Sequence, residues 1–200
     1  MKKYNVIYAD PPWSYGKNSF PSTSNKFAYP TLETERIARM PVAELIADDA
    51  VLFLWTTMLH IPDALKVVDA WGFRYVTNGF TWVKTNPRKN TLFLGMGYWT
   101  RQNAELCLLA KRGNPKRFST RIPSVIIHPR GLHSQKPDII RNRITSICGN
   151  VPRLELFARQ RTPGWDVWGN EVVSDVALLV PPPATSDCKN DRLATNTTTG

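Results

Sequence analysis

Cysteine is scarce and scattered in this 200-residue sequence. Its three cysteines, Cys107, Cys148 and Cys188, lie far apart and form no CxxC pair. This spacing excludes a disulfide framework and the paired thiols of a structural zinc site. The three histidines share no metal-ligand spacing with the cysteines, so we expect no metal site. These absences together predict a protein of a reducing, cytoplasmic environment.

Long hydrophobic runs are also missing. The longest apolar stretch covers residues 50–55, whereas a membrane span needs roughly 20 residues. The first residues lead into a short apolar run that ends at Asp10, which does not match a signal peptide. The hydrophobic fraction of 42% still suffices for a sizeable core. We therefore expect a folded chain with no membrane anchor.

Acidic residues are few, above all in the second half of the chain. The sequence has 26 Lys and Arg against 16 Asp and Glu, for a net charge of +10. Between Lys84 and Arg161 there are 16 basic and 3 acidic residues, so this stretch alone carries +13. Such a concentration predicts an electropositive face and a polyanionic partner, namely nucleic acid. The alternative is a basic surface that only keeps the protein in solution.

Short apolar runs alternate with segments of helical periodicity along the chain. Residues 4–9 are predicted to form a short buried strand. It ends at Asp10-Pro11-Pro12, because a strand interior does not tolerate prolines. Further strands are predicted over 50–57, 74–84, 104–110, 124–127 and 153–158, and helices over 32–39, 61–71 and 137–147, with another short helix starting at 41–42. This order predicts an α/β fold with a mostly parallel sheet and helices on both faces. We expect a single domain over residues 1–175 and a disordered tail over 176–200, where prolines and small polar residues dominate.

The residues Asp10-Pro11-Pro12-Trp13 directly follow the first predicted strand. In open α/β sheets ligands bind beyond the carboxyl ends of strands, so this motif is expected at a binding site. A carboxylate and a proline-fixed carbonyl oxygen can each accept one N–H bond of a nucleobase amino group, which localises the lone pair of its nitrogen. Trp13 then offers a ring on which the base stacks. The alternative is a proline-rich turn with a buried tryptophan.

The Asp-Pro-Pro-Trp motif resembles the catalytic signature of the permuted amino-methyltransferases that act on adenine N6. This family includes the eukaryotic messenger-RNA N6-adenosine methyltransferase. The resemblance extends over about residues 4–172, with the family's motifs in the family's order. These are AYPTL at 28–32, LFLWTT at 52–57, WGF at 71–73, TWVKTN at 81–86, GYW at 97–99, KRGNP at 111–115, HSQKPD at 133–138, ELFAR at 155–159 and WGNE at 168–171. One departure is Gln135, where the family commonly has Arg or His.

The resemblance implies a Rossmann-like fold that binds S-adenosylmethionine. It assigns the catalytic role to Asp10, Pro11, Pro12 and Trp13. For the cofactor it implies Asp10, Lys136, Glu155, Phe157, Arg159, Asn170 and Glu171. A lysine such as Lys136 pairs with the methionine carboxylate of the cofactor by a charge-assisted bond.

A further set of residues is expected on the substrate side. Tyr29 resembles a tyrosine that closes over the target base. Glu105 resembles a residue that orders the substrate loop, although a local salt bridge explains Glu105 nearly as well. Trp55 and Trp82 are expected either in the base pocket or in the core. Lys116 and Arg117 are expected to contact phosphates from a loop beside the substrate.

A glycine-rich segment competes for the cofactor role. Residues 93–97 spell FLGMG, which matches the cofactor loop of many methyltransferases. That loop should follow an apolar strand and open a helix. Here it follows Asn86-Pro87-Arg88-Lys89-Asn90, so we interpret it as a loop on the substrate side.

Three functions remain to be separated. The first is an adenine-N6 methyltransferase of nucleic acid, with DNA favoured over RNA because the chain carries neither zinc-finger spacing nor a separate recognition domain. The second is a non-catalytic nucleic-acid-binding partner subunit, which Asp10 and Trp13 argue against. The third is cytosine-N4 methylation, for which Ser would be expected at position 10. Association into a homodimer is left open.

Overall fold

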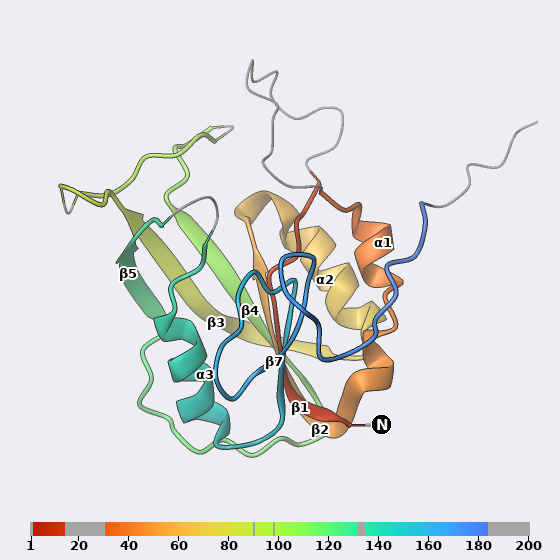
Figure 1. Ribbon diagram of the computed structural model, residues 1–200. Helices are drawn as coiled ribbons and strands as arrows, with labels where there is room; N and C mark the ends of the chain where they lie inside the picture. The colour runs from red at the N-terminus through yellow and green to blue at the C-terminus, as the bar shows by residue number, and fades with distance from the viewer. Residues whose placement is uncertain (1, 15–30, 90, 98, 132–134, 184–200) are drawn as a thin grey trace, which may run out of the picture.

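The computed structural model describes residues 2–14, 31–89, 91–97, 99–131 and 135–183. Seven strands form one curled sheet in the order β5-β3-β4-β2-β1-β6-β7 (Figure 1). Their bounds are β1 Tyr4–Ala9, β2 Ile46–Thr56, β3 Arg74–Thr85, β4 Ala104–Arg112, β5 Val125–Pro129, β6 Arg153–Leu156 and β7 Asp166–Trp168. The three-residue β7 is too short for a periodic signal, and the sequence did not predict it.

The sheet is mostly parallel, as predicted. Parallel pairs are β1–β2, β1–β6, β3–β5 and β6–β7, whereas β4 is antiparallel to both β2 and β3. Because β4 reverses direction between them, β3 and β2 run the same way. The carboxyl ends of β1, β2, β3, β6 and β7 therefore share one edge of the sheet.

Helices cover both faces, which confirms the predicted Rossmann-like arrangement. Helices α1 (Thr34–Ala38) and α2 (Ile61–Ala70) pack on one face and α3 (Ile139–Cys148) on the other. Two short 3₁₀ segments, Val42–Leu45 and Met58–His60, precede β2 and α2. Within the described residues no helix is long and apolar enough to cross a bilayer.

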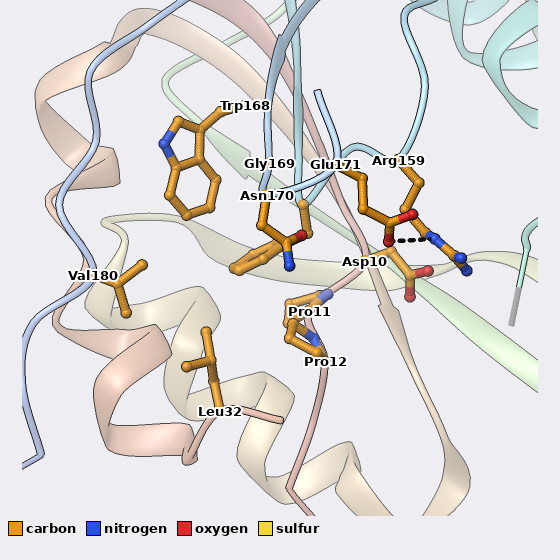
Figure 2. Close-up of a pocket in the computed structure, with 11 residues that line it drawn as sticks. Asp10, Pro11, Pro12, Leu32, Arg159, Trp168, Gly169, Asn170, Glu171 and Val180 are labelled. Atoms are coloured by element: carbon orange, nitrogen blue, oxygen red, sulfur yellow. Dashed lines mark hydrogen bonds and ion pairs between the residues drawn. The ribbon is translucent and has the colours of Figure 1, made fainter. Parts of the chain in front are cut away.

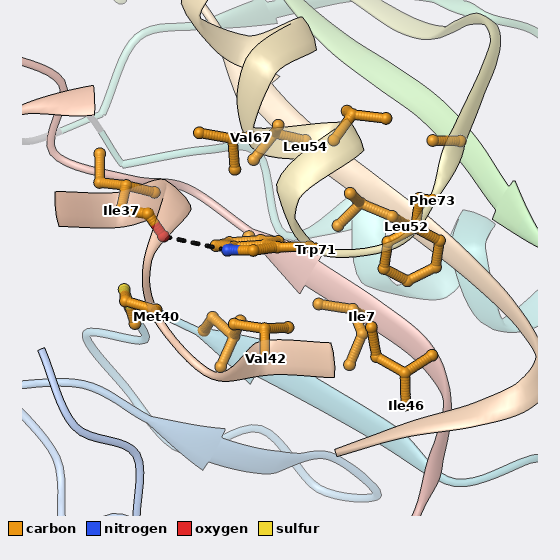
Figure 3. Close-up of a cluster of buried hydrophobic side chains, with 14 of the residues drawn as sticks. Ile7, Ile37, Met40, Val42, Ile46, Leu52, Leu54, Val67, Trp71 and Phe73 are labelled. Carbon is orange, nitrogen blue, oxygen red and sulfur yellow. Dashed lines mark hydrogen bonds between the residues drawn. The ribbon is translucent and has the colours of Figure 1, made fainter. Parts of the chain in front are cut away.

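Trp71 is central to the core on the α1–α2 face. Its side chain is fully buried between the two helices and the sheet, and its Nε1 donates a hydrogen bond to the carbonyl oxygen of Ile37 at 3.0 Å (Figure 3). The bond matters because an indole N–H buried without a partner would cost free energy. Trp71 thus joins α2, which it follows, to α1.

The disordered tail does not begin at residue 176 as predicted. Val176, Leu178 and Val180 pack against the α1–α2 core, and the segment is described as far as residue 183. The predicted start of the tail was wrong because three consecutive prolines are typical of a linker. The apolar residues before them form too short a run to predict a helix or strand. The predicted tail from 184 onward lies outside the described residues.

Candidate active site

A pocket opens at the edge where the parallel strands end (Figure 2). Asp10 follows β1, Arg159 follows β6, and Gly169 follows β7, so three neighbouring strands deliver residues to it. This is the place where open α/β sheets bind ligands. The lining comprises Asp10, Pro11, Pro12, Leu32, Phe157, Arg159, Trp168, Gly169, Asn170, Glu171 and Val180.

The pocket has an apolar and a polar end. Leu32, Trp168 and Val180 lie on one side of it, and Asp10, Arg159 and Glu171 lie on the other (Figure 2). Arg159 Nε donates to a Glu171 carboxylate oxygen at 2.8 Å. A long ligand with an apolar ring at one end and charged groups at the other would match this division.

Phe157 has an unusual backbone conformation beside the pocket. Its φ is 62°, in the left-handed region that residues with a side chain rarely adopt. Its ring meets Trp168 edge to face, with ring centroids 5.4 Å apart. Such strain persists only where the surroundings enforce it, and it is frequent at binding sites. The turn places the ring of Phe157 in the pocket, where the resemblance predicted a cofactor contact.

Asp10 belongs to a chain of alternating charges. Lys136 Nζ donates to Asp10 at 2.7 Å and lies 3.2 Å from Glu105, whose other oxygen is paired with Lys84. Lys136 and Glu105 are both largely buried, whereas a third of the Asp10 side chain stays accessible. The four side chains carry two positive and two negative charges, and of their two carboxylates Asp10 is the one that lines the pocket.

The pKa values of the chain follow from burial and from these neighbours. Burial raises the pKa of Asp10 above its ordinary value, and the opposing pull of Lys136 does not fully offset this. Burial also acts to raise the pKa of Glu105, but Lys136 and Lys84 outweigh it and hold that pKa low. The two carboxylates raise the pKa of Lys136, so its ammonium keeps its charge despite burial. Glu105 thus forms the local salt bridge that the sequence offered as an alternative, and its negative charge also raises the pKa of Asp10.

The turn after β1 is held by backbone bonds and by Trp13. The carbonyl of Pro11 accepts the N–H of Trp13 at 2.9 Å, and that of Pro12 accepts the N–H of Leu32 at 2.8 Å. Trp13 is only 6% exposed, its indole N–H donates to the carbonyl of Trp55 at 3.0 Å, and its ring is stacked on His60. The prediction that Trp13 offers an open ring for a stacking base is therefore wrong, because the Trp13 side chain is buried and anchors the turn in the core.

Trp55 and Trp82 are core residues and do not line the pocket. Both are essentially unexposed, with edge-to-face rings 6.5 Å apart. Trp55 donates to the hydroxyl of Tyr8 and Trp82 to the carbonyl of His128. Strand ends carry core as well as site residues, and the sequence does not distinguish them.

Glu155 does not reach the pocket either. Both of its carboxylate oxygens accept bonds from Arg141 of α3, at 2.7 and 2.6 Å, and its side chain is buried. The resemblance implied that Glu155 contacts the cofactor, but in the structure Glu155 links β6 to α3 through its ion pair with Arg141. Arg141 was not singled out in the sequence, and no local pattern marks such a pair.

Lys116 and Arg117 lie at the wrong edge of the sheet for the predicted role. They follow β4, which runs antiparallel to β2 and so ends at the edge opposite Asp10. Asn114 N–H donates to Asp49 Oδ1 at 2.7 Å, and Lys116 lines a second, shallow pocket with Asn5, at the start of β1. The prediction placed this loop beside the substrate without knowing that β4 is reversed, and the structure separates the loop from the edge where Asp10 lies.

The FLGMG segment lies within the β3–β4 connection, as interpreted from the sequence. No helix follows it in the described residues, and Gly95 N–H donates to the carbonyl of Gln102 across the loop. Tyr29 lies outside the described residues. Leu32, Trp168, Gly169 and Val180 line the pocket without having been predicted to do so, although Trp168 and Gly169 belong to a quoted motif. Within the described residues no cluster of three or more potential metal ligands is present.

Comparison with known proteins agrees with the geometry. Residues 4–171 match the MT-A70 family model. The chain belongs to the MT-A70 family. Type II methyltransferase M.MunI from Mycoplasma sp. is 34% identical over 192 residues, covering 86% of this chain and 78% of that protein. The human N(6)-adenosine-methyltransferase catalytic subunit METTL3 is 30% identical over 185 residues, covering 90% of this chain but only 30% of METTL3.

MT-A70 membership confirms the class of enzyme predicted from the motifs, an adenine-N6 methyltransferase. The Drosophila melanogaster MT-A70-like N(6)-adenosine-methyltransferase is 29% identical over 186 residues, which cover 91% of this chain and 29% of that protein. The chain thus spans less than a third of these adenosine methyltransferases and most of the type II enzyme.

Proposed function

We propose that this chain transfers a methyl group from S-adenosylmethionine to the N6 amino group of adenine in DNA. The observation that carries the proposal is the position of Asp10. Its carboxylate and the two prolines after it stand at the rim of a pocket that also contains Phe157 and Asn170. The methyl donor and the accepting amino group would meet at that rim.

The pocket suits S-adenosylmethionine in its chemistry. The apolar end, with Trp168 and Val180, suits the adenine ring of the cofactor, and Asn170 supplies amide groups for ring or ribose edges. At the polar end Asp10 would face the ammonium of the methionine part, and Lys136 beside it would take the carboxylate. When bound, the cofactor supplies an electrophilic methyl group on a sulfonium.

Asp10 and Pro11 would prepare the amino group. An exocyclic amine is a poor nucleophile because its lone pair is delocalised into the base. A bond from one N–H to the Asp10 carboxylate and from the other to the Pro11 carbonyl favours a tetrahedral nitrogen, whose lone pair is then available. The prolines restrict φ, and the bonds of their carbonyls to Trp13 and Leu32 hold the turn before the base arrives.

Similarity to the type II enzyme favours DNA as the substrate. That enzyme is matched over 78% of its length and METTL3 over 30%. RNA is the second candidate, supported by the 30% identity with METTL3. In duplex DNA the adenine must leave the stack to reach Asp10, at a cost of about a few kcal/mol.

Methyl transfer from labelled S-adenosylmethionine tests the proposal. Single-stranded DNA, duplex DNA and RNA of the same sequence are incubated with the wild-type protein and with Asp10→Asn, and the nucleosides are then separated. We expect label in N6-methyl-2′-deoxyadenosine with the wild type only. Label in N6-methyladenosine alone would replace DNA by RNA, and label in a cytosine nucleoside would overturn the proposal.

A further inference from the structure

The segment after the family match contributes to the pocket. We call residues 175–183 the strap; the matched region ends at residue 171. Along the strap, Val176, Leu178 and Val180 are partly buried against the α1–α2 core, and the residues between them, Ala177 and Leu179, are exposed. This alternation is typical of an extended chain with one face on the protein.

Both ends of the strap are fastened. At its start Asp175 accepts two bonds from Arg161, at 2.8 and 3.0 Å, and another from the N–H of Val167 in β7. At its other end Arg36 of α1 donates to the carbonyl of Pro181 at 2.8 Å, and Arg39 donates to that of Pro182 at 2.7 Å. Prolines lack an N–H but keep their carbonyls as acceptors, so this end is held by arginines without a partner strand.

The strap crosses from β7 to α1 along one wall of the pocket. Figure 1 shows it passing beside α1, and in Figure 2 Val180 lies on the same side as Leu32 and Trp168, across from Pro11 and Pro12. Val180 is the strap residue that lines the pocket. Its isopropyl group adds to the apolar surface that Leu32 and Trp168 present at this end of the pocket.

We infer that the strap positions the adenosine part of the cofactor, with Val180 as the contact. The inference rests on the proposed function, in which the polar end with Asp10 takes the methionine part. An elongated cofactor held there by its charged groups has its nucleoside at the opposite end, where Val180 stands. Val180 is a positioning residue, because it bears no group that takes part in methyl transfer.

Calorimetry with two ligands tests the inference. S-Adenosylhomocysteine carries both ends of the cofactor, and 5′-methylthioadenosine lacks the amino-acid end. Val180→Asp places a charge in the apolar end, so we expect its affinity for both ligands to fall by at least about tenfold, and by the same factor for each. Val180→Thr, which keeps the shape, should fall less. Leu179→Asp is the matched control, since Leu179 is on the same segment but 71% exposed, and it should bind both ligands like the wild type.

The fastening is tested separately from the contact. The double variant Arg36→Ala/Arg39→Ala removes the bonds to Pro181 and Pro182 and leaves the pocket lining intact. We expect weaker binding of both ligands and faster proteolytic cleavage within the strap. Thermal melting of every variant establishes that the domain is folded.

The outcomes separate the two levels of the argument. If the wild type binds neither ligand, or if Asn170→Ala binds both unchanged, the proposed cofactor pocket is wrong. If those controls behave as expected and folded Val180→Asp retains wild-type affinity, the strap inference is overturned. A loss for S-adenosylhomocysteine but not for 5′-methylthioadenosine would also overturn it, by moving the contact to the methionine end.

Discussion

Asp10 combines two demands that oppose each other. It must be accessible to a base, and it must remain ionised although burial raises its pKa. Lys136 opposes the effect of burial, although it does not fully offset it, by lying 2.7 Å from one carboxylate oxygen while a third of the Asp10 side chain stays accessible. The charge of Lys136 is in turn balanced by Glu105.

Replacement of Asp10 by Asn should abolish methyl transfer without unfolding the protein. The amide keeps the shape but cannot accept a hydrogen bond with a full negative charge, and loss of one such preorganised contact costs about 3–4 kcal/mol of transition-state stabilisation. Single-turnover rates with labelled cofactor measure the loss. A folded variant within about tenfold of the wild-type rate, a difference of about 1.4 kcal/mol, would contradict the role of Asp10.

Replacing Glu105 and replacing Lys84 should shift the acidic limb of the profile of kcat/KM against pH in opposite directions. The negative charge of Glu105 raises the pKa of Asp10 and the positive charge of Lys84 lowers it. Activity needs the carboxylate and is lost as pH falls through that pKa. Glu105→Gln should therefore move the limb to lower pH, and Lys84→Met should move it to higher pH.

The profile of kcat/KM against pH measures both shifts, since it reports the free enzyme. The position of the limb is compared, not the height of the plateau, because both variants are expected to lose some activity. Shifts in the same direction for the two variants would show that the charges do not act on Asp10.

Among the connections between elements, the β3–β4 loop is the one that we expect to meet nucleic acid. It follows β3 at the same edge as Asp10 and carries the exposed Arg88 and Lys89. Lys116 and Arg117 are also exposed and carry the same charge, but they follow β4 at the opposite edge. The two pairs therefore allow the two edges to be compared.

Arg88→Ala/Lys89→Ala should weaken nucleic-acid binding for all sequences and flatten its salt dependence. Each lost phosphate contact reduces the slope of log affinity against log salt by about 0.7–0.9, so we expect a change of about one to two units. Lys116→Ala/Arg117→Ala should leave affinity and slope close to wild type. Filter binding over a salt series decides the matter, and the reverse result would place the substrate at the other edge.

In the molecule as a whole, the pocket depends on a core that joins α1 to the sheet, because α1 also holds the strap. Trp71 makes this connection through its buried ring and its bond to Ile37. Trp71→Ala would leave a large cavity and would remove the indole hydrogen bond to the Ile37 carbonyl, which keeps its bond from the N–H of Met40.

Trp71→Ala should lower the free energy of unfolding by about 3–5 kcal/mol. Trp99 is fully exposed, so Trp99→Ala is the matched control and should change stability by less than about 0.5 kcal/mol. Urea denaturation followed by circular dichroism measures both. Equal midpoints for the two variants would refute the structural role of Trp71.

Local pattern alone determined most of the elements and the chemistry of the main motif. The prolines after residues 4–9 end the first strand whatever the tertiary structure, and the apolar run at 50–57 belongs in a buried strand, which the structure extends to Ile46–Thr56. The order of strands and helices likewise sufficed for a mostly parallel sheet. These features depend on φ restriction and on apolar periodicity, which are properties of neighbouring residues.

The tertiary structure decided at which edge of the sheet each residue lies and whether its side chain reaches the pocket. The reversal of β4 sends Lys116 and Arg117 away from Asp10, and the pairing of Glu155 with Arg141 withdraws a carboxylate from the pocket. Packing likewise buries Trp13, while the strap brings Val180 to the pocket from beyond the matched region. Strand direction, ion pairing and burial depend on residues far apart in the chain, so a reading of neighbouring residues does not contain them.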